Sequence, residues 1–200
     1  MNCSLNSENL LNLAMVSSAE EYAKTNLPDE IQAIEGSGRR DELAMLNIFE
    51  KAIIYKYSTN GFSELNERLR ESEGNHNSEF GELLDSALAK LPNYVGLIYR
   101  TADLTKAELQ LYKNSLKKKK AVTEYCFISA TKSRTFAMYL KLNTLFMIMS
   151  KTGKEIEKIA KFGVFEPPNE SEVLFRYKQQ FKVLDITKEG SRTLIKMEEV

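Results

Sequence analysis

Residues 91–100, with the sequence Leu-Pro-Asn-Tyr-Val-Gly-Leu-Ile-Tyr-Arg, mark the point where the chain changes from helical to extended character. Pro92 has no backbone N–H to donate, so it ends the helical pattern that precedes it. The run Tyr94–Arg100 is rich in β-branched and aromatic residues and predicts a strand with Arg100 at its end. Helical patterns therefore lie mostly before this stretch, and strand patterns mostly after it.

Before the stretch, apolar residues recur at the spacing of amphipathic helices in three segments. A polar loop at 71–79 separates the second segment from the third, and it contains the chain's only histidine, His76. A single histidine in a loop makes a Ser-His-Asp triad or a His-rich metal centre an unfavourable interpretation. The residues that define the three helices are Leu46, Phe49 and Ile53, then Phe62, Leu65 and Leu69, then Leu84, Ala87, Leu88 and Leu91.

After the stretch, one further helix is predicted by the capping box Thr105-x-x-Glu108. Its apolar face continues to Leu116. The helix is expected to end at Lys117–Lys120, because positive charges at a helix C-terminus interact favourably with the helix dipole. Helices grouped first and strands grouped afterwards indicate an α+β fold rather than alternating βαβ units. The expected strands cover 122–128, 144–149, 172–175, 181–186 and 193–197, with a short helix near Gly153–Lys161.

Length and composition exclude several function classes. The chain has 200 residues, 28 Lys and Arg against 28 Asp and Glu, and 42% hydrophobic residues, which favours one neutral globular domain and disfavours bulk polyanion binding. Cys3 and Cys126 are too few for a disulfide framework or a zinc site. No apolar run approaches the roughly 18 residues that a membrane span needs, and there is no GxGxxG or GxxxxGK[ST] motif.

The first 40 residues differ from the rest. They are polar, rich in Asn and Ser, and end at Gly36-Ser37-Gly38, which predicts a helical or flexible, loosely docked arm (1–40) before a main domain (41–200). The start of the chain has neither a basic nor an apolar signal-peptide region, so no cleavable secretory signal is expected. The Asn- and Ser-rich opening is typical of a disordered terminus and also of a non-cleaved signal for a specialised secretion machine.

Glu170 and Glu172 are the most informative pair of ionisable residues. They lie in Glu166–Phe175, a proline-containing loop that leads into a predicted strand. On a strand, residues at i and i+2 point to one face, about 7 Å apart. Two such carboxylates suit the cleavage of a glycosidic bond, in which one stabilises a cationic sugar centre and the other manages a proton. On an exposed strand the same pair is only a solvated face.

Two other segments carry weaker signals. The Arg100 guanidinium can donate two parallel hydrogen bonds to a phosphate, although a surface ion pair is the commoner explanation of an isolated Arg. The hydroxyls of 127–133 follow a predicted strand and can donate to a carboxylate or a ribose, but turns have the same composition. The Lys117–Lys120 run indicates a solvated helix end more than a nucleic-acid contact in a neutral chain.

Taken in order, these signals resemble a known family. Over residues 43–198 the chain is similar to the bacterial mono-ADP-ribosyltransferase toxins of the arginine-serine-glutamate class, in the biglutamate variant of arginine-modifying members. The matching segments are Tyr57–Arg70, Leu84–Arg100, Phe127-x-Ser129-Ala130-Thr131, Gly153-Lys154 with Ile156 and Ile159, and Glu170–Phe175. Ala130 replaces a Thr of the family and Thr131 replaces a Ser. The Pro and Gly that often follow the strand of the two glutamates are absent from residues 176–180.

The resemblance implies a fold and a set of residue roles. The implied fold packs N-terminal helices on a mixed, mostly antiparallel two-sheet β core. NAD would be the substrate, with no metal. The implied roles are Arg100 on an NAD phosphate, Ser129 orienting Glu172, Glu172 on the nicotinamide ribose, Glu170 on the acceptor guanidinium, Tyr57 and Phe127 against the nucleotide, and Phe165 touching the target protein.

The function implied is transfer of ADP-ribose to an arginine of a protein, of which actin and GTPases are examples, with NAD hydrolysis as a side activity. The resemblance also implies a toxin or effector that is secreted without a cleavable signal and acts in the cytoplasm of a target cell. Two alternatives stay open. One is a non-catalytic interaction module with the same fold, and the other is an ADP-ribosyltransferase that modifies a nucleic acid or a small molecule.

Overall fold

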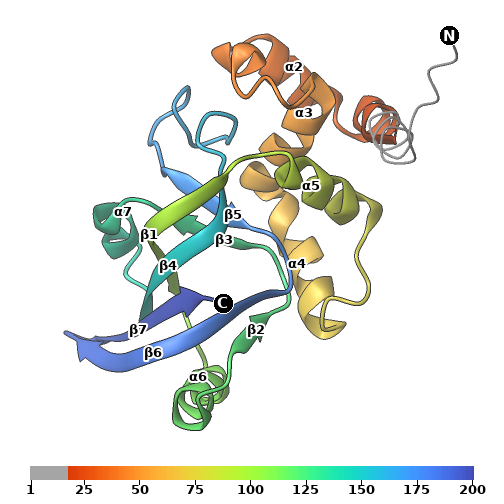
Figure 1. Cartoon of the computed structure of the whole chain (residues 1–200). Coiled ribbons are helices and arrows are strands. Elements are labelled where there is room, and N and C mark those ends of the chain that lie inside the picture. The colour runs from red at the N-terminus through yellow and green to blue at the C-terminus, as the bar shows by residue number, and fades with distance from the viewer. Residues whose placement is uncertain (1–17) are drawn as a thin grey trace, which may run out of the picture.

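A computed structural model describes residues 18–200 of the chain. The interpretation of the Asn- and Ser-rich opening as a terminus or a secretion signal falls on residues 1–17 and lies outside this range. Helices formed by the first half of the chain lie on one side of a curved sheet formed by the second half (Figure 1). The α+β class expected from the order of patterns is therefore confirmed.

The helical half begins with a helical segment over 18–26 and is built from short helices with clear start signals. Asn47 and Glu50 form a capping box at the start of α3, and the Ser78 side chain caps α5. The helical path continues through Asn60 and Gly61, because the π-helical segment η2 joins α3 directly to α4. The elements are α2 (Pro28–Glu35), η1 (Gly38–Asp41), α3 (Ile48–Lys56), η2 (Tyr57–Gly61), α4 (Phe62–Glu71) and α5 (Glu79–Ala89).

Residues 18–40 are largely helical and are packed against the other helices, so the helical form of the expected N-terminal arm is the one present in this range. Ala23 and Ile34 are fully buried in the same apolar cluster as Ile53 and Leu84. The polar composition hid this packing because only one side of each short helix is apolar. Division of the chain at residue 40 stays a prediction.

The second half forms one seven-stranded sheet in the order β1-β3-β5-β4-β7-β6-β2. β1 pairs with both β3 and β4, so β1, β3, β5 and β4 close into a small ring, where two separate sheets were expected. Only β4 and β7 run parallel among the pairs described. The strands are β1 (Asn93–Ala102), β2 (Val122–Glu124), β3 (Ile128–Thr131), β4 (Thr144–Glu155), β5 (Glu172–Phe175), β6 (Gln179–Glu189) and β7 (Arg192–Glu199).

The helix predicted near Gly153–Lys161 does not form. β4 continues to Glu155, where it pairs with β5, and turns follow it. Lys154 is held in the strand because its Nζ donates to Leu91 O and Asn93 Oδ1 at 2.7 and 2.6 Å. A Cβ at Gly153 would lie 2.7 Å from the side chains of Ser150 and Val173, so the glycine permits close packing of strands rather than a helix start.

Two helices accompany the sheet. α6 (Lys106–Lys118) starts at the predicted capping box of Thr105 and Glu108, which is confirmed. α7 (Arg134–Tyr139) was not predicted. The strand expected at 122–128 is divided into β2 and β3, because residues 125–127 leave the sheet.

Within 18–200 there is no helix with both the length and the apolar character that crossing a membrane requires.

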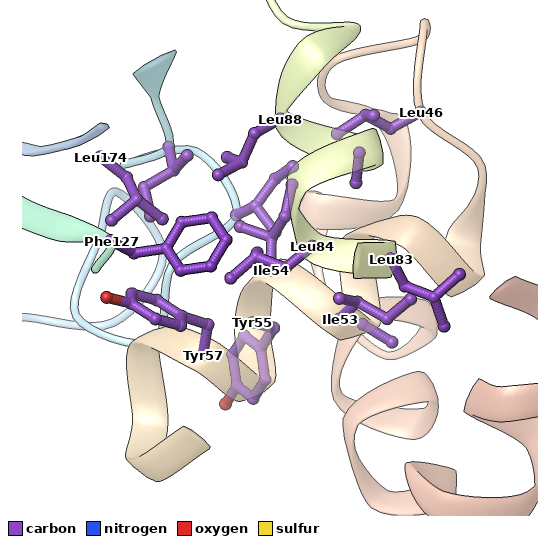
Figure 2. Packing of buried hydrophobic residues seen from close by; sticks show 14 of the residues in the cluster. Leu46, Ile53, Ile54, Tyr55, Tyr57, Leu83, Leu84, Leu88, Phe127 and Leu174 are labelled. Carbon is purple, nitrogen blue, oxygen red and sulfur yellow. The ribbon is translucent and has the colours of Figure 1, made fainter. Parts of the chain in front are cut away.

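The main apolar cluster lies where the helices meet the ring of strands. Figure 2 shows the ring of Tyr57 next to that of Phe127 at this junction, with Leu174 of β5 nearby. The ring centroids of Tyr57 and Phe127 are 5.8 Å apart. A second cluster fills the space between the sheet and α6. The junction between the helices and the sheet is therefore closely packed.

Candidate functional site

Three cavities have Arg100 in their lining, and the first of them lies where the helical half meets the sheet. One of about 300 Å³ is lined by residues of η2, α4, β1, β3 and the segment before β5. A second, of about 180 Å³, lies between β1, β3 and α7. The third, of about 380 Å³, extends toward α6 and β2.

Arg100 is half-buried on β1, and its side chain is held in place by the neighbouring strand. Its Nη1 donates to the backbone O of Ser129 at 2.8 Å. The pairing of Tyr99 with Thr131 brings β1 and β3 together at this position. Because this bond goes to a carbonyl and not to a carboxylate, it does not compensate the charge of the guanidinium, and further N–H donors remain for an anion.

Ser129 and Glu172 are in direct contact. Ser129 Oγ donates to Glu172 Oε1 at 2.6 Å, across the antiparallel pair β3 and β5. Glu172 is 8% exposed. Burial raises the pKa of Glu172 to about 7; the Ser129 hydrogen bond opposes this rise, and the charge of Glu170 adds to it. The site thus holds a carboxylate at the edge of ionisation near neutral pH.

Glu170 lies two residues before the start of β5, so the two acidic residues are not on a straight strand. Ser171 has a φ of 48°, in the left-handed region. The backbone of Glu170 is fixed at both ends, since Thr131 Oγ1 donates to its O at 2.6 Å and its N donates to Phe162 O at 3.0 Å. Both carboxylates line the same two cavities, so they share a face as predicted, through a bend instead of strand alternation.

The Glu170 carboxylate has no hydrogen bond or ion pair within the described part of the chain. Desolvation raises its pKa. An acidic group that is half-buried and lacks a cation is suited to receive one from a ligand.

Tyr57 and Phe127 form the wall of the first cavity. Asn66 connects them, because its Nδ2 donates to the Tyr57 hydroxyl at 3.0 Å and its Oδ1 accepts from Phe127 N at 3.1 Å. Burial raises the pKa of Tyr57 far above its usual range, so the phenol is neutral. Both side chains are almost completely buried, so each offers the cavity a narrow surface.

Phe165 stands apart from the other residues singled out from the sequence. It lies in the loop between β4 and β5, is 40% exposed, and lines none of the three cavities. Its ring lies over the Arg39 guanidinium, 5.7 Å from centroid to Cζ. The structure thus brings Arg100, Ser129, Glu170, Glu172, Tyr57 and Phe127 together and places Phe165 outside this group.

Three cavity residues were missed as site candidates. Arg70 on α4 lines two of the cavities and lies beside the Cys126 thiol. Its spacing of four from Asn66 puts both on one helix face, a signal that the sequence does contain. Thr101 and Phe136 line the second cavity. Thr101 Oγ1 is buried without a partner among the described residues, and nothing in the local sequence indicates this.

The described residues contain no group of three or more His, Cys, Asp or Glu side chains arranged to hold a metal ion. The chemistry available from the side chains at the site is that of a guanidinium, hydroxyls, aromatic rings and two carboxylates.

Comparisons with known proteins point in one direction. The family described as ADP-ribosyltransferase exoenzyme matches residues 18–200. A protein of Mycobacterium avium (strain 104), named "Putative NAD(+)--arginine ADP-ribosyltransferase Mav", is 29% identical over 175 residues, which are 85% of this chain and 20% of that protein. The chain therefore spans about a fifth of the length of this curated relative.

Solved structures share the fold at low identity. The ADP-ribosyltransferase HopU1 of Pseudomonas syringae pv. Tomato DC3000 is 19% identical with a TM-score of 0.73, over 87% of each chain. Exoenzyme S from Pseudomonas aeruginosa, solved with human 14-3-3 protein beta and carba-NAD, is 16% identical with a TM-score of 0.74, over 94% of this chain and 89% of that one.

Proposed function

Because the chain belongs to the ADP-ribosyltransferase exoenzymes, a family of NAD-using toxins and effectors, we propose that it transfers ADP-ribose from NAD to an arginine of a protein. The observation that carries the proposal is the hydrogen bond from Ser129 to the buried Glu172, at the meeting point of cavities that also hold Arg100 and Glu170. The identity of the acceptor side chain rests on Glu170 and on the name of the Mycobacterium avium relative.

In this proposal the NAD phosphates lie against Arg100 and Arg70. Both side chains line the first and third cavities, so two guanidiniums face the same space. A diphosphate is held well by such a pair, because each guanidinium can donate two parallel hydrogen bonds. The ribose next to nicotinamide then reaches the carboxylate of Glu172.

Glu172 acts on the bond that breaks. As the bond between C1′ and the nicotinamide nitrogen cleaves, the electron pair leaves with nicotinamide and positive charge develops on the ribose. An ionised carboxylate held by Ser129 stabilises that charge without reorganising. The acceptor nitrogen then forms the new bond to C1′ and loses one proton. Water in place of the acceptor gives free ADP-ribose.

Glu170 acts on the acceptor. Its carboxylate lacks a cation in the described structure and lines the same cavities as Glu172. A guanidinium fits this carboxylate through charge-assisted hydrogen bonds. Glu170 then orients the attacking nitrogen and takes its proton.

The biological role that fits is that of a toxin or effector which modifies a protein in the cytoplasm of a target cell. A non-catalytic module would not need a buried, hydrogen-bonded Glu172, because burial of a carboxylate with a raised pKa is unfavourable for folding at neutral pH.

Labelling tests the proposed function. The protein is incubated with labelled NAD and a host-cell extract, and the labelled protein and its modified residue are identified by mass spectrometry. We expect label on an arginine. Label on a nucleic acid would instead support the alternative acceptor class. Absence of both label and released nicotinamide would show a binding module.

Arg100→Lys tests the phosphate contact. An ammonium cannot reproduce the planar fork, so NAD affinity measured by calorimetry is expected to fall about tenfold or more, the equivalent of one charge-assisted hydrogen bond. Arg134→Lys is the control, because Arg134 pairs with Glu189 on the surface and lines none of the three cavities. Unchanged affinity of Arg100→Lys would remove the phosphate role.

A further inference from the structure

The loop between β4 and β5, residues 156–171, contains Glu170 near its end and has little regular structure of its own. A few backbone bonds shape it. Val164 N donates to Glu157 O at 2.9 Å, and Glu170 N donates to Phe162 O at 3.0 Å. The place of Glu170 thus depends directly on the place of Phe162, and so on whatever holds the first part of the loop.

Arg39 holds that part. It is only 4% exposed, and its guanidinium donates to three successive backbone carbonyls. Nε donates to Ile159 O at 3.0 Å, and Nη2 donates to Ala160 O and Lys161 O at 3.2 and 3.1 Å. The last of these carbonyls belongs to the residue immediately before Phe162.

Arg39 also packs between aromatic rings and approaches an acid of the loop. Its Cζ lies 5.0 Å from the ring centroid of Tyr55 on α3 and 5.7 Å from that of Phe165 in the loop. Nη2 lies 3.5 Å from Glu166 Oε2. A Cβ on Gly38 would come within 2.3 Å of the Phe165 ring, so the backbone before Arg39 is in close contact with the loop as well.

A second hydrogen bond connects residues 159–161 to the wall of the first cavity. Ser58 Oγ accepts a hydrogen bond from Lys161 N at 2.8 Å, and Ser58 lines the first cavity next to Tyr57. The segment 159–161 is thus fixed from two sides by the helical half of the molecule.

The carboxylate of Glu172 is held by a partner outside this segment. Glu172 lies on β5, which pairs with β3 from Thr131 to Ile128, and its carboxylate accepts from Ser129. Its backbone also has a partner in the loop, because Ile156 N donates to Glu172 O at 3.1 Å, but Ile156 comes before residues 159–161, which Arg39 holds. Both acidic residues thus contact β3, since Thr131 Oγ1 also donates to Glu170 O. They differ in that Glu170 N is bonded to Phe162 O, next to the segment that Arg39 holds.

We propose that Arg39 is a positioning residue for the acceptor half of the reaction: by holding residues 159–161 it sets the location of Glu170, while cleavage of NAD proceeds without it. The proposal rests on the proposed function. It assigns a catalytic consequence to a residue that precedes every motif of the sequence resemblance and lies 131 positions before Glu170.

Arg39→Met tests the assignment, since it keeps a long apolar side chain between the rings and removes every donor. Two rates are measured, hydrolysis of NAD and transfer to agmatine, a small molecule with a guanidine group. We expect the ratio of transfer to hydrolysis to fall about tenfold or more, because a displacement of about 1 Å in a catalytic group costs up to a hundredfold. The KM for NAD is expected to stay unchanged.

Two further variants make the result specific. Arg39→Lys retains one cationic donor and should restore part of the ratio, and it decides the case if Arg39→Met does not fold. Lys90→Met is the matched control. Lys90 pairs with Glu50 at 2.5 Å in the helical half, far along the chain from the loop, so its loss should affect both rates in proportion.

The outcomes are distinguishable. A wild-type protein with neither hydrolysis nor transfer would overturn the proposed function and this inference with it. An active wild type whose ratio is unchanged in the Arg39 variants, or whose two rates fall together as in Lys90→Met, would overturn the inference alone. A selective fall in transfer with partial recovery in Arg39→Lys would establish it.

Discussion

Glu172→Gln is expected to abolish both transfer of ADP-ribose and hydrolysis of NAD. Both reactions cleave the same bond, and the amide cannot offer a negative charge to the developing cation. Loss of one preorganised electrostatic contact of this kind lowers kcat by about 10²–10³. Release of nicotinamide, followed with and without agmatine, measures both reactions in one assay.

The same substitution is expected to stabilise the fold, which separates lost chemistry from lost structure. The pKa of Glu172 is raised to about 7 from 4.5, so its protonated form favours the folded state. The stabilisation of the folded state by protonated Glu172 is complete below about pH 4.5 and is lost as the pH rises through 7. At pH 8 the wild type should therefore be less stable than Glu172→Gln by roughly 3 kcal/mol, at about 1.4 kcal/mol for each pKa unit, and nearly equal at about pH 5.

Glu199→Gln is the matched control, because Glu199 is also a buried carboxylate. It accepts from the backbone N of Lys151 and of Thr152, and it lines none of the three cavities described at Arg100. A neutral amide accepts such bonds more weakly, so this variant should be less stable than wild type and keep its activity. A Glu172→Gln protein that still releases nicotinamide at the wild-type rate would contradict the role given to Glu172.

The sequence predicted the elements whose signals are local. Pro92 and the run after it predicted the change from helix to strand, and β1 begins at Asn93. Thr105 and Glu108 predicted the start of α6, because a capping box needs only its own four residues. The order of Arg100, Ser129 and the two glutamates also pointed to one site, and the structure places them around adjoining cavities.

Other features depend on residues that are distant in sequence, and local patterns could not predict them. Lys154 extends β4 because its ammonium meets Leu91 and Asn93, which lie 63 and 61 residues earlier. Arg39 is buried in what looked like a polar arm because carbonyls of 159–161 accept its bonds. In both cases a charged side chain signals exposure in the sequence, whereas tertiary hydrogen bonds make its burial possible.

Glu170→Gln is expected to separate the two reactions that Glu172→Gln removes together. The amide introduced by this substitution has nearly the size of the carboxylate, but it can neither form an ion pair with a guanidinium nor take its proton. Transfer to agmatine should fall by about 10²–10⁴, the usual contribution of a positioned base. Hydrolysis of NAD should stay within a few-fold of wild type, because water is a small nucleophile and Glu172 with Ser129 is unchanged.

The structure supports this separation through the environments of the two acids. The Glu172 carboxylate accepts a hydrogen bond from Ser129 inside the sheet. The Glu170 carboxylate is half-buried, and it has no cationic partner in the described region. Glu155→Gln is the control, since Glu155 pairs with Lys132, the residue after β3, and lines none of the three cavities. If Glu170→Gln lost hydrolysis as completely as transfer, both carboxylates would serve bond cleavage, and the acceptor would have to be activated by another group.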